Sequence, residues 1–241
     1  MNFRHSLPSN IQIITDRQSF IAELCRGKDV LHLGCVDSGL MDEAIEKDNF
    51  LQAKIAKVAN TVIGVDNDVE GIAFLEKRKN DSEKFYSLDI EKINADTIKE
   101  KIDIVIAGEI LEHLSNVGNF LKGMRELLLR HKAKMVVTVP NAYSIRHIKA
   151  VETGREIVHP DHNYYFSYVT IKALLQKFLL TATDIYLYNT PFSEIKGFSY
   201  TSIVELLNRY DIRRRIKRSP FLSEGLIFIV EPVLNENTAC Q

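Results

Sequence analysis

The sequence predicts an α/β fold with a mostly parallel sheet that helices cover on both faces. Short apolar runs at residues 30–33, 103–108 and 135–139 are typical of parallel strands that are buried on both sides. An amphipathic segment between Val117 and Leu128 repeats apolar residues at i, i+3, i+4 and i+7, the spacing of one helix face. Strands that alternate with helices in this way favour a parallel sheet.

The first half of the chain is expected to alternate helices with three strands. A helix over residues 17–25 packs its apolar side chains inward, and the apolar run at 30–33 follows it as the first strand. A longer helical pattern over 42–59 ends at Asn60, before a second strand at 63–66. A third, short strand ends just before Leu88 and Asp89.

The second half continues the same alternation. Strands at 103–109 and 135–141 flank the amphipathic helix, which closes at residues 130–132 with positive charge where the helix dipole is negative. Ser167 is a good N-cap for another helix, because its hydroxyl can accept a hydrogen bond from the first turn. Two further apolar runs, 184–188 and 226–231, are expected to be strands.

Composition narrows the class of protein. The 241-residue chain is 45% hydrophobic, enough for the core of one domain. A formal net charge of −1 excludes the overall basic surface that binds long nucleic acids. Cys25, Cys35 and Cys240 lack paired spacing, which predicts reduced thiols in a cytoplasmic protein. No apolar run approaches the ~20 residues of a spanning helix, so neither secretion nor membrane passage is expected.

The most informative motif is the glycine-bearing loop that follows the first strand. Residues 30–33 run directly into Gly34-Cys35-Val36-Asp37-Ser38-Gly39. Glycine at the end of a buried strand lets the backbone turn and approach a ligand closely. The second strand ends in Asp66, which is placed to accept hydrogen bonds from both hydroxyls of a ribose. Together these features indicate a site for a nucleotide-type cofactor.

With these motifs, roughly residues 28–190 resemble the class I S-adenosylmethionine-dependent methyltransferases. The first motif of that family normally reads Val-Leu-Asp-Leu-Gly-Cys-Gly-x-Gly. Here His32 stands in place of the acid, and Val36-Asp37-Ser38 replaces the middle glycine with a loop one residue longer. The resemblance implies a Rossmann-like, seven-stranded, mostly parallel sheet with a small cap insertion before the last strand. It implies S-adenosylmethionine as cofactor, bound by His32, Gly34, Cys35, Gly39, Asp66, Asn67, Asp89, Ile90 and Gly108.

The chain is expected to form a single domain over residues 1–241. Its parts are an N-terminal lead at 1–28, a cofactor-binding core at 28–190, a cap at 190–222, and the last strand and tail at 223–241. The cap carries a basic cluster made of Arg209, Arg213, Arg214, Arg215, Lys217 and Arg218. Such a cluster is either a solvated helix face or a contact for an anion, such as a nucleotide sugar, a lipid pyrophosphate or a membrane surface.

Chemistry is expected at the ends of the fourth and fifth strands, because open α/β sheets bind ligands at the carboxyl ends of their strands. The fourth strand leads into Glu109, and a helix that began there would place Glu109, Glu112 and His113 on one face. A later loop carries His159 and His162. The Glu-x-x-Glu-His motif with a distant histidine resembles the metal site of small-RNA 2′-O-methyltransferases and the equivalent positions in ubiquinone-pathway O-methyltransferases.

By that resemblance Glu109, Glu112, His113 and His162 would bind one divalent ion, Mg²⁺, Mn²⁺, Zn²⁺ or Fe²⁺, which could lower the pKa of an acceptor hydroxyl. Without a metal, His113 is the best candidate for a general base, with His159 and His162 as competitors. The glutamates would then be favourable charges at a helix N-terminus. We accordingly predict Glu112, His113 and His162 as catalytic residues.

The leading functional prediction is an O-methyltransferase that acts on a small hydroxylated acceptor such as a sugar, a glycan precursor or a natural product. Residues 154–167 look similar to methyltransferases encoded with bacterial surface-polysaccharide genes, which favours a carbohydrate. One alternative is a nicotinamide-dependent oxidoreductase, which the lack of a G-x-G-x-x-G motif disfavours. Another is a non-catalytic cofactor-binding protein with a degenerate first motif.

Overall fold

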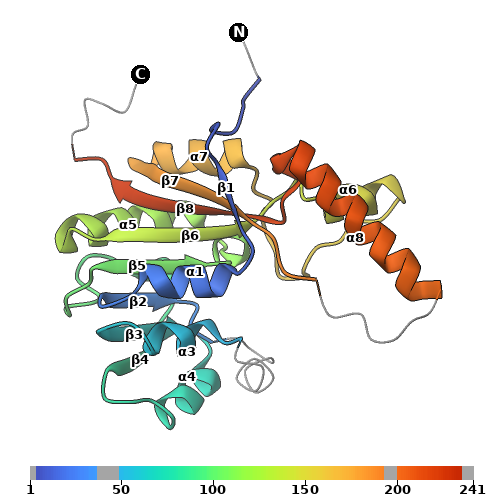
Figure 1. Cartoon of the computed structure of the whole chain (residues 1–241). Coiled ribbons are helices and arrows are strands. Elements are labelled where there is room, and N and C mark those ends of the chain that lie inside the picture. Colours follow the sequence, from blue (N-terminus) through green and yellow to red (C-terminus); the bar gives the residue numbers. More distant parts are fainter. Residues whose placement is uncertain (1–3, 37–48, 193–199, 235–241) are drawn as a thin grey trace.

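The computed structural model describes residues 4–36, 49–192 and 200–234, and Figure 1 shows their arrangement. In this part of the chain eight strands form one sheet in the order β1-β7-β8-β6-β5-β2-β3-β4. The strands are β1 (Gln12–Ile14), β2 (Asp29–Leu33), β3 (Thr61–Asp66), β4 (Glu83–Ser87), β5 (Ile104–Gly108), β6 (Lys134–Pro140), β7 (Leu180–Tyr188) and β8 (Gly225–Pro232).

Helices cover both faces of the sheet (Figure 1). One face carries α1 (Arg17–Leu24), α3 (Leu51–Ala56) and α4 (Val69–Glu76), and the other carries α5 (Val117–His131) and α7 (Tyr168–Lys177). Two more helices, α6 (Ile145–Glu152) and α8 (Tyr200–Arg218), lie together beyond the edge of the sheet. Three short 3₁₀ helices connect these elements: η1 (Ile90–Lys92), η2 (Leu111–His113) and η3 (Pro220–Leu222).

The predicted Rossmann-like fold is confirmed. Strand β8 runs antiparallel to both β6 and β7, while the other strand pairs are parallel. The sequence did not predict β1, which adds an eighth strand at the edge by pairing in parallel with β7, Gln12 opposite Tyr186. A strand of three residues has too short a hydrophobic pattern to recognise.

The amphipathic helix α5 covers the sheet as predicted. Its apolar face is at most 5% exposed and consists of Val117, Phe120, Leu121, Met124, Leu127 and Leu128. The helix ends at His131, and the left-handed φ of 54° at the following Lys132 stops the α-helical path. Ser167 caps α7 by accepting a hydrogen bond from the N–H of Thr170. The sequence predicted both helices correctly because the apolar spacing of α5 and the N-cap of α7 each depend only on nearby residues.

Some boundaries differ from the prediction. Of the helix expected over 42–59, the described part is α3, which ends at Ala56, and residues 42–48 lie outside the described residues. Strand β7 begins at Leu180, earlier than expected. Helix α8 continues through the whole basic cluster as far as Arg218. No helix in the described ranges is long and apolar enough to cross a membrane.

Candidate active site

The loop after β2 depends on glycine at position 34. Gly34 has a left-handed φ of +67°, and a Cβ at this position would lie 2.6 Å from Cγ2 of Ile110. Both the backbone conformation and this close approach therefore require a residue without a side chain. Gly39, the second predicted glycine of the motif, lies outside the described residues.

Asp66 ends β3 and joins two loops at the edge of the sheet. Its Oδ2 accepts a hydrogen bond from the N–H of Val36 (3.0 Å), and its Oδ1 accepts one from the N–H of Asp68 (3.0 Å). The residue is 9% exposed. Each carboxylate oxygen has a second lone pair, so the side chain can still accept two hydroxyl hydrogen bonds. This arrangement is compatible with the predicted ribose contact.

His32 is buried within the sheet layer. Its Nδ1 lies 2.7 Å from Oε1 of Gln52, and the amide of Gln52 donates to Oε1 of Glu83 (3.0 Å). Burial lowers the pKa of His32 to about 4, so the ring is neutral at pH 7. Because Oε1 of Gln52 can only accept, Nδ1 carries the ring proton and donates this hydrogen bond. Cys35 is also buried, and burial raises the pKa of its thiol.

The remaining predicted cofactor residues lie at the ends of neighbouring strands. Asp89 follows β4 and caps η1, accepting a hydrogen bond from the N–H of Glu91 (3.0 Å). Ile90 is half-buried beside it, Asn67 is exposed after β3, and Gly108 is the last residue of β5. Because β3, β4 and β5 run in parallel with β2, these residues share the carboxyl-end edge with Gly34.

The expected α-helix at Glu109 does not form. Glu109 has a left-handed φ of 54°, which breaks the helical path, and only η2 follows it. The prediction that Glu109, Glu112 and His113 share one α-helical face is therefore wrong. This left-handed backbone gives the side chain of Glu109 its own direction, and the side chain makes contacts that Glu112 and His113 do not share.

The carboxylate of Glu109 lies in a network that the sequence did not predict. It accepts hydrogen bonds from the hydroxyls of Thr138 (2.8 Å) and Tyr188 (3.0 Å) and pairs with Arg17 (3.2 Å). Arg17 also donates to Oγ1 of Thr138 (3.0 Å). Burial, followed by the charge of Glu109, raises the pKa of Tyr188. Only Tyr188 carried a sequence signal for this network, because it stands at the end of a predicted strand. The contacts of Arg17 and Thr138 with Glu109 depend on the tertiary fold.

Glu112 is buried without a partner for its carboxyl group. The residue is 1% exposed, and neither carboxyl oxygen has a hydrogen-bond partner among the described residues. Burial, and next the charge of Glu109, raises the pKa of Glu112 to about 8. The side chain is therefore mostly protonated at neutral pH.

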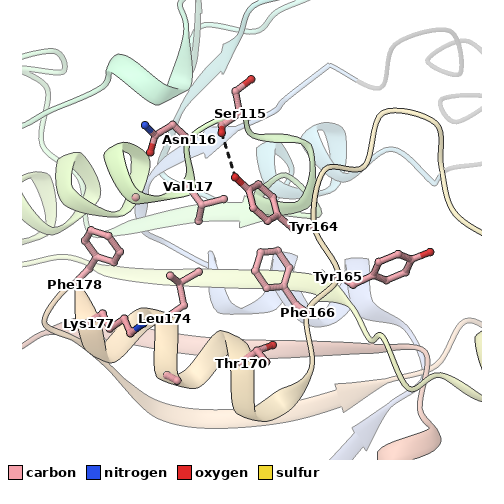
Figure 2. Close-up of a pocket in the computed structure, with 12 residues that line it drawn as sticks. Ser115, Asn116, Val117, Tyr164, Tyr165, Phe166, Thr170, Leu174, Lys177 and Phe178 are labelled. Carbon is pink, nitrogen blue, oxygen red and sulfur yellow. Dashed lines mark hydrogen bonds between the residues drawn. The ribbon is translucent and has the colours of Figure 1, made fainter.

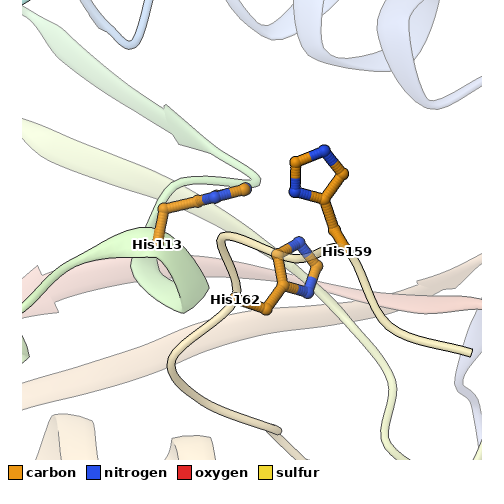
Figure 3. Close-up of side chains that lie close together, drawn as sticks. All are labelled: His113, His159 and His162. Carbon is orange, nitrogen blue, oxygen red and sulfur yellow. The ribbon is translucent and has the colours of Figure 1, made fainter. Parts of the chain in front are cut away.

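Three histidines converge beside η2, as Figure 3 shows. The rings of His113 and His162 are 4.5 Å apart between centroids at an interplanar angle of 89°, and His159 lies 5.6 Å from His113. Among the described residues, this is the only group of three or more His, Cys, Asp or Glu side chains whose ligand atoms all lie within 4.8 Å of one another. The structure thus brings His113 and His162 together as predicted, adds His159, and leaves the carboxylates of Glu109 and Glu112 outside the group.

The same packing lowers the basicity of two of these rings. Partial desolvation by the surrounding loop, and next the neighbouring charge of His159, lowers the pKa of His113, although the residue is exposed overall. Burial, followed by the charges of His113 and His159, lowers the pKa of His162. Both imidazoles are therefore protonated less readily than an ordinary histidine, and a neutral imidazole offers a lone pair to a proton or a metal ion.

Asn163 holds the histidine loop against η2. Its backbone N–H donates to the carbonyl oxygen of Glu112 (2.7 Å). Its side-chain amide donates to the carbonyl oxygens of His113 (3.0 Å) and Leu114 (3.3 Å). The loop closes on itself through a bond from the N–H of His162 to the carbonyl of His159 (3.0 Å). These bonds explain why His159 and His162, which follow His113 by 46 and 49 positions in the chain, meet it at one site.

A pocket of about 710 Å³ opens next to this loop (Figure 2). Its walls come from the start of α5, from α7 and from the segment that follows Asn163. Tyr164 and Phe166 stack with ring centroids 6.0 Å apart, and the Tyr164 hydroxyl donates to the carbonyl of Ser115 (3.2 Å). Most of the lining is apolar or aromatic, which is typical of pockets for small ligands.

The basic cluster lies on α8, which packs on α6. Lys149 of α6 pairs with Asp211 (3.3 Å) across this contact. The guanidinium groups of Arg209 and Arg213 lie over the ring of Phe192, 5.0 and 5.3 Å from its centre. Part of the cluster is therefore occupied in holding the cap, while Arg214 is exposed.

Comparison with known proteins identifies the family. The profile of a family described as a methyltransferase domain matches residues 24–182. The chain belongs to this family and is an S-adenosylmethionine-dependent methyltransferase. Both alternatives, the nicotinamide-dependent oxidoreductase and the non-catalytic binding protein, are thereby set aside. No curated protein matches the chain.

Solved structures share the fold at low sequence identity. The methyltransferase from Haloferax volcanii, solved with the Trm112 activator, has a TM-score of 0.55 at 12% identity over 88% of this chain and 84% of that one. The small RNA methyltransferase HEN1 has a TM-score of 0.56 at 16% identity over 94% of this chain and 27% of that one. Magnesium protoporphyrin IX methyltransferase from Synechocystis has a TM-score of 0.50 at 13% identity over 88% and 77%. At these identities the likeness establishes the fold.

Proposed function

We propose that this enzyme transfers a methyl group to a hydroxyl oxygen of a small acceptor such as a sugar, a glycan precursor or a natural product. The observation that carries the proposal is the pair of adjacent imidazoles, His113 and His162, whose ring centroids lie 4.5 Å apart just beyond the end of β5 and whose pKa values are both lowered. A hydroxyl becomes a good nucleophile only when its proton is removed, and imidazole is suited to this near neutral pH.

The residues at the sheet edge fit S-adenosylmethionine. Gly34 leaves space for close approach, and the two oxygens of Asp66 can accept the two ribose hydroxyls. We assign cofactor contacts to the predicted set: His32, Gly34, Cys35, Gly39, Asp66, Asn67, Asp89, Ile90 and Gly108. The bound cofactor supplies a methyl group already activated on a sulfonium, so the chain itself has to align the acceptor and take its proton.

Three residues are proposed to act on the acceptor. His113 and His162 are imidazole bases that the structure brings together beyond the end of β5, with ring centroids 4.5 Å apart. Glu112 stays a predicted catalytic residue, because a carboxyl with a pKa of about 8 exchanges protons in the working pH range. A divalent ion held by Glu109, Glu112, His113 and His162 also stays a prediction, although the geometry favours a different ligand set, argued below.

The aromatic pocket supports a ring-shaped acceptor. Tyr164 and Phe166, which follow the histidine loop in the chain, offer stacked aromatic rings at the pocket against which the ring of an acceptor can pack. The exposed arginines of the cap suit the phosphates of a nucleotide-linked acceptor. Both features favour a sugar or an aromatic natural product over a protein side chain.

Labelled S-adenosylmethionine tests the proposal. The enzyme is incubated with panels of nucleotide sugars, free sugars, phenolic natural products, amines and a short RNA, and the products are analysed by mass spectrometry. We expect label in an ether-linked methyl group of a sugar or phenol. His113→Ala should lower kcat by about 10²- to 10⁴-fold while S-adenosylhomocysteine affinity is retained, and exposed His5→Ala is the matched control. Label confined to nitrogen would contradict O-methylation.

A further inference from the structure

We propose that His113, His159 and His162 form a binding site for one divalent transition-metal ion of the zinc or iron class. The role of the ion rests on the proposed function, whereas the binding of the ion does not. The proposed site replaces the ligand set expected from sequence with three nitrogen donors. This change of donors also changes the kind of metal, because imidazole suits zinc, iron, nickel and copper whereas carboxylate and water suit magnesium.

The geometry is close to that of a metal site. Imidazole nitrogens bind zinc at about 2.0–2.1 Å, which puts neighbouring tetrahedral ligands roughly 3.3 Å apart. Here the ligand atoms of the three histidines all lie within 4.8 Å of one another. His113 and His159 are exposed and His162 is half-buried, so their rings can turn by the small amount that closure requires.

Asp161 lies beside the rings of His113 and His159, in the position that outer-shell partners of metal-binding histidines commonly take. The backbone of Asp161 faces the ring of His113 and favours its protonated form. The carboxylate of Asp161 lies 3.8 Å from Nδ1 of His159. The same Nδ1 accepts a long hydrogen bond from the N–H of Asp161 (3.3 Å), which His159 can release because its side chain is 56% exposed.

The two glutamates are poor ligands in this fold. Glu109 would have to leave the hydroxyls of Thr138 and Tyr188 and the guanidinium of Arg17. The side chain of Glu112 is 1% exposed and would have to leave the core. Three histidines alone leave at least one position open on the ion, as in catalytic zinc sites. Under the proposed function an acceptor hydroxyl takes that position.

Metal binding to the tag-free full-length chain is measured by calorimetry with zinc chloride and, separately, by the visible absorption of added cobalt. We expect one ion per chain and no displacement of cobalt by a large excess of magnesium. His159→Ala should weaken zinc binding by at least about 10-fold. His5→Ala and Glu109→Gln should leave it unchanged, with thermal unfolding confirming that each variant is folded.

Two results would overturn the site: full zinc affinity in His159→Ala, or loss of zinc binding in Glu109→Gln. The second would return the ion to the glutamate-containing set. Zinc binding is measured without methyl donor or acceptor. Its absence would therefore remove the metal site and leave O-methylation standing, whereas purely N-methylated products would remove O-methylation and leave the metal site standing.

Discussion

The backbone N–H of Asn163 donates a hydrogen bond to the carbonyl oxygen of Glu112, 2.7 Å away. This bond joins the loop that carries His159 and His162 to the 3₁₀ helix that carries His113. The side chain of Asn163 adds two more bonds to the same helix end. Histidines from two distant segments are thereby held at one place, and Asn163 is a positioning residue for both.

Replacing the Asn163 side chain should loosen the histidine cluster. Asn163→Ala removes the bonds to the carbonyls of His113 and Leu114 but keeps the backbone bond. We expect zinc affinity to fall by about 10-fold, the scale seen for outer-shell partners, with S-adenosylhomocysteine affinity unchanged. Calorimetry measures both, with exposed Asn119→Ala as control. Equal zinc affinity in the two variants would show that the backbone bond alone positions the loop.

Asp66→Ala should weaken cofactor binding. Loss of two charge-assisted hydrogen bonds to a ribose is worth ~1.5 to 3 kcal/mol, roughly one to two decades in Kd. Calorimetric titration with S-adenosylhomocysteine measures the change. Exposed Asp81→Ala serves as the control, and a thermal unfolding curve separates lost contacts from lost structure. Undiminished affinity would refute the ribose assignment.

The raised pKa of Glu112 predicts that the protein becomes less stable as the pH rises. Its pKa is about 8 in the folded chain against an ordinary value of 4.5, so the folded state binds the proton more tightly. The free energy of unfolding should therefore decline as pH rises from about 4.5 to about 8. Glu112→Gln removes this decline.

Thermal unfolding by circular dichroism across this pH range tests the prediction. Each kcal/mol shifts Tm by about 2–4 °C in a chain of this size, so Glu112→Gln should gain several degrees over the parent protein at the alkaline end. Glu126→Gln, an exposed change on α5, should follow the parent at every pH. Parallel profiles for all three proteins would contradict the raised pKa.

The cap arginines should affect the acceptor and not the cofactor. Charge reversal at the exposed Arg214 and Arg218 should raise acceptor KM by about one decade if they hold a phosphate, since a hydrogen bond to a charged group contributes about 1.5–3 kcal/mol. Steady-state kinetics with a nucleotide-linked acceptor measures the change, and S-adenosylhomocysteine affinity is the internal control. Unchanged KM in a folded variant would make the cluster a solvated helix face.

The features that sequence predicted well depend on local patterns. The buried face of α5, the cap at Ser167 and the glycine at position 34 each follow from residues within one or two turns. The site was predicted less completely because its parts depend on tertiary contacts. The left-handed backbone of Glu109 turns its carboxylate toward Arg17, and the turn from His159 to His162 brings a third ring to the cluster.

The edge strand β1 has a consequence for synthesis of the chain on the ribosome. Gln12 pairs with Tyr186, and Arg17 reaches Glu109 and Thr138 only when the sheet is assembled. At about 5–20 residues per second, these first residues emerge on the order of ten seconds or more before β7 is made. Strand β1 therefore leaves the ribosome well before its partner β7, so the pairing of these two strands is a late step in the folding of the sheet.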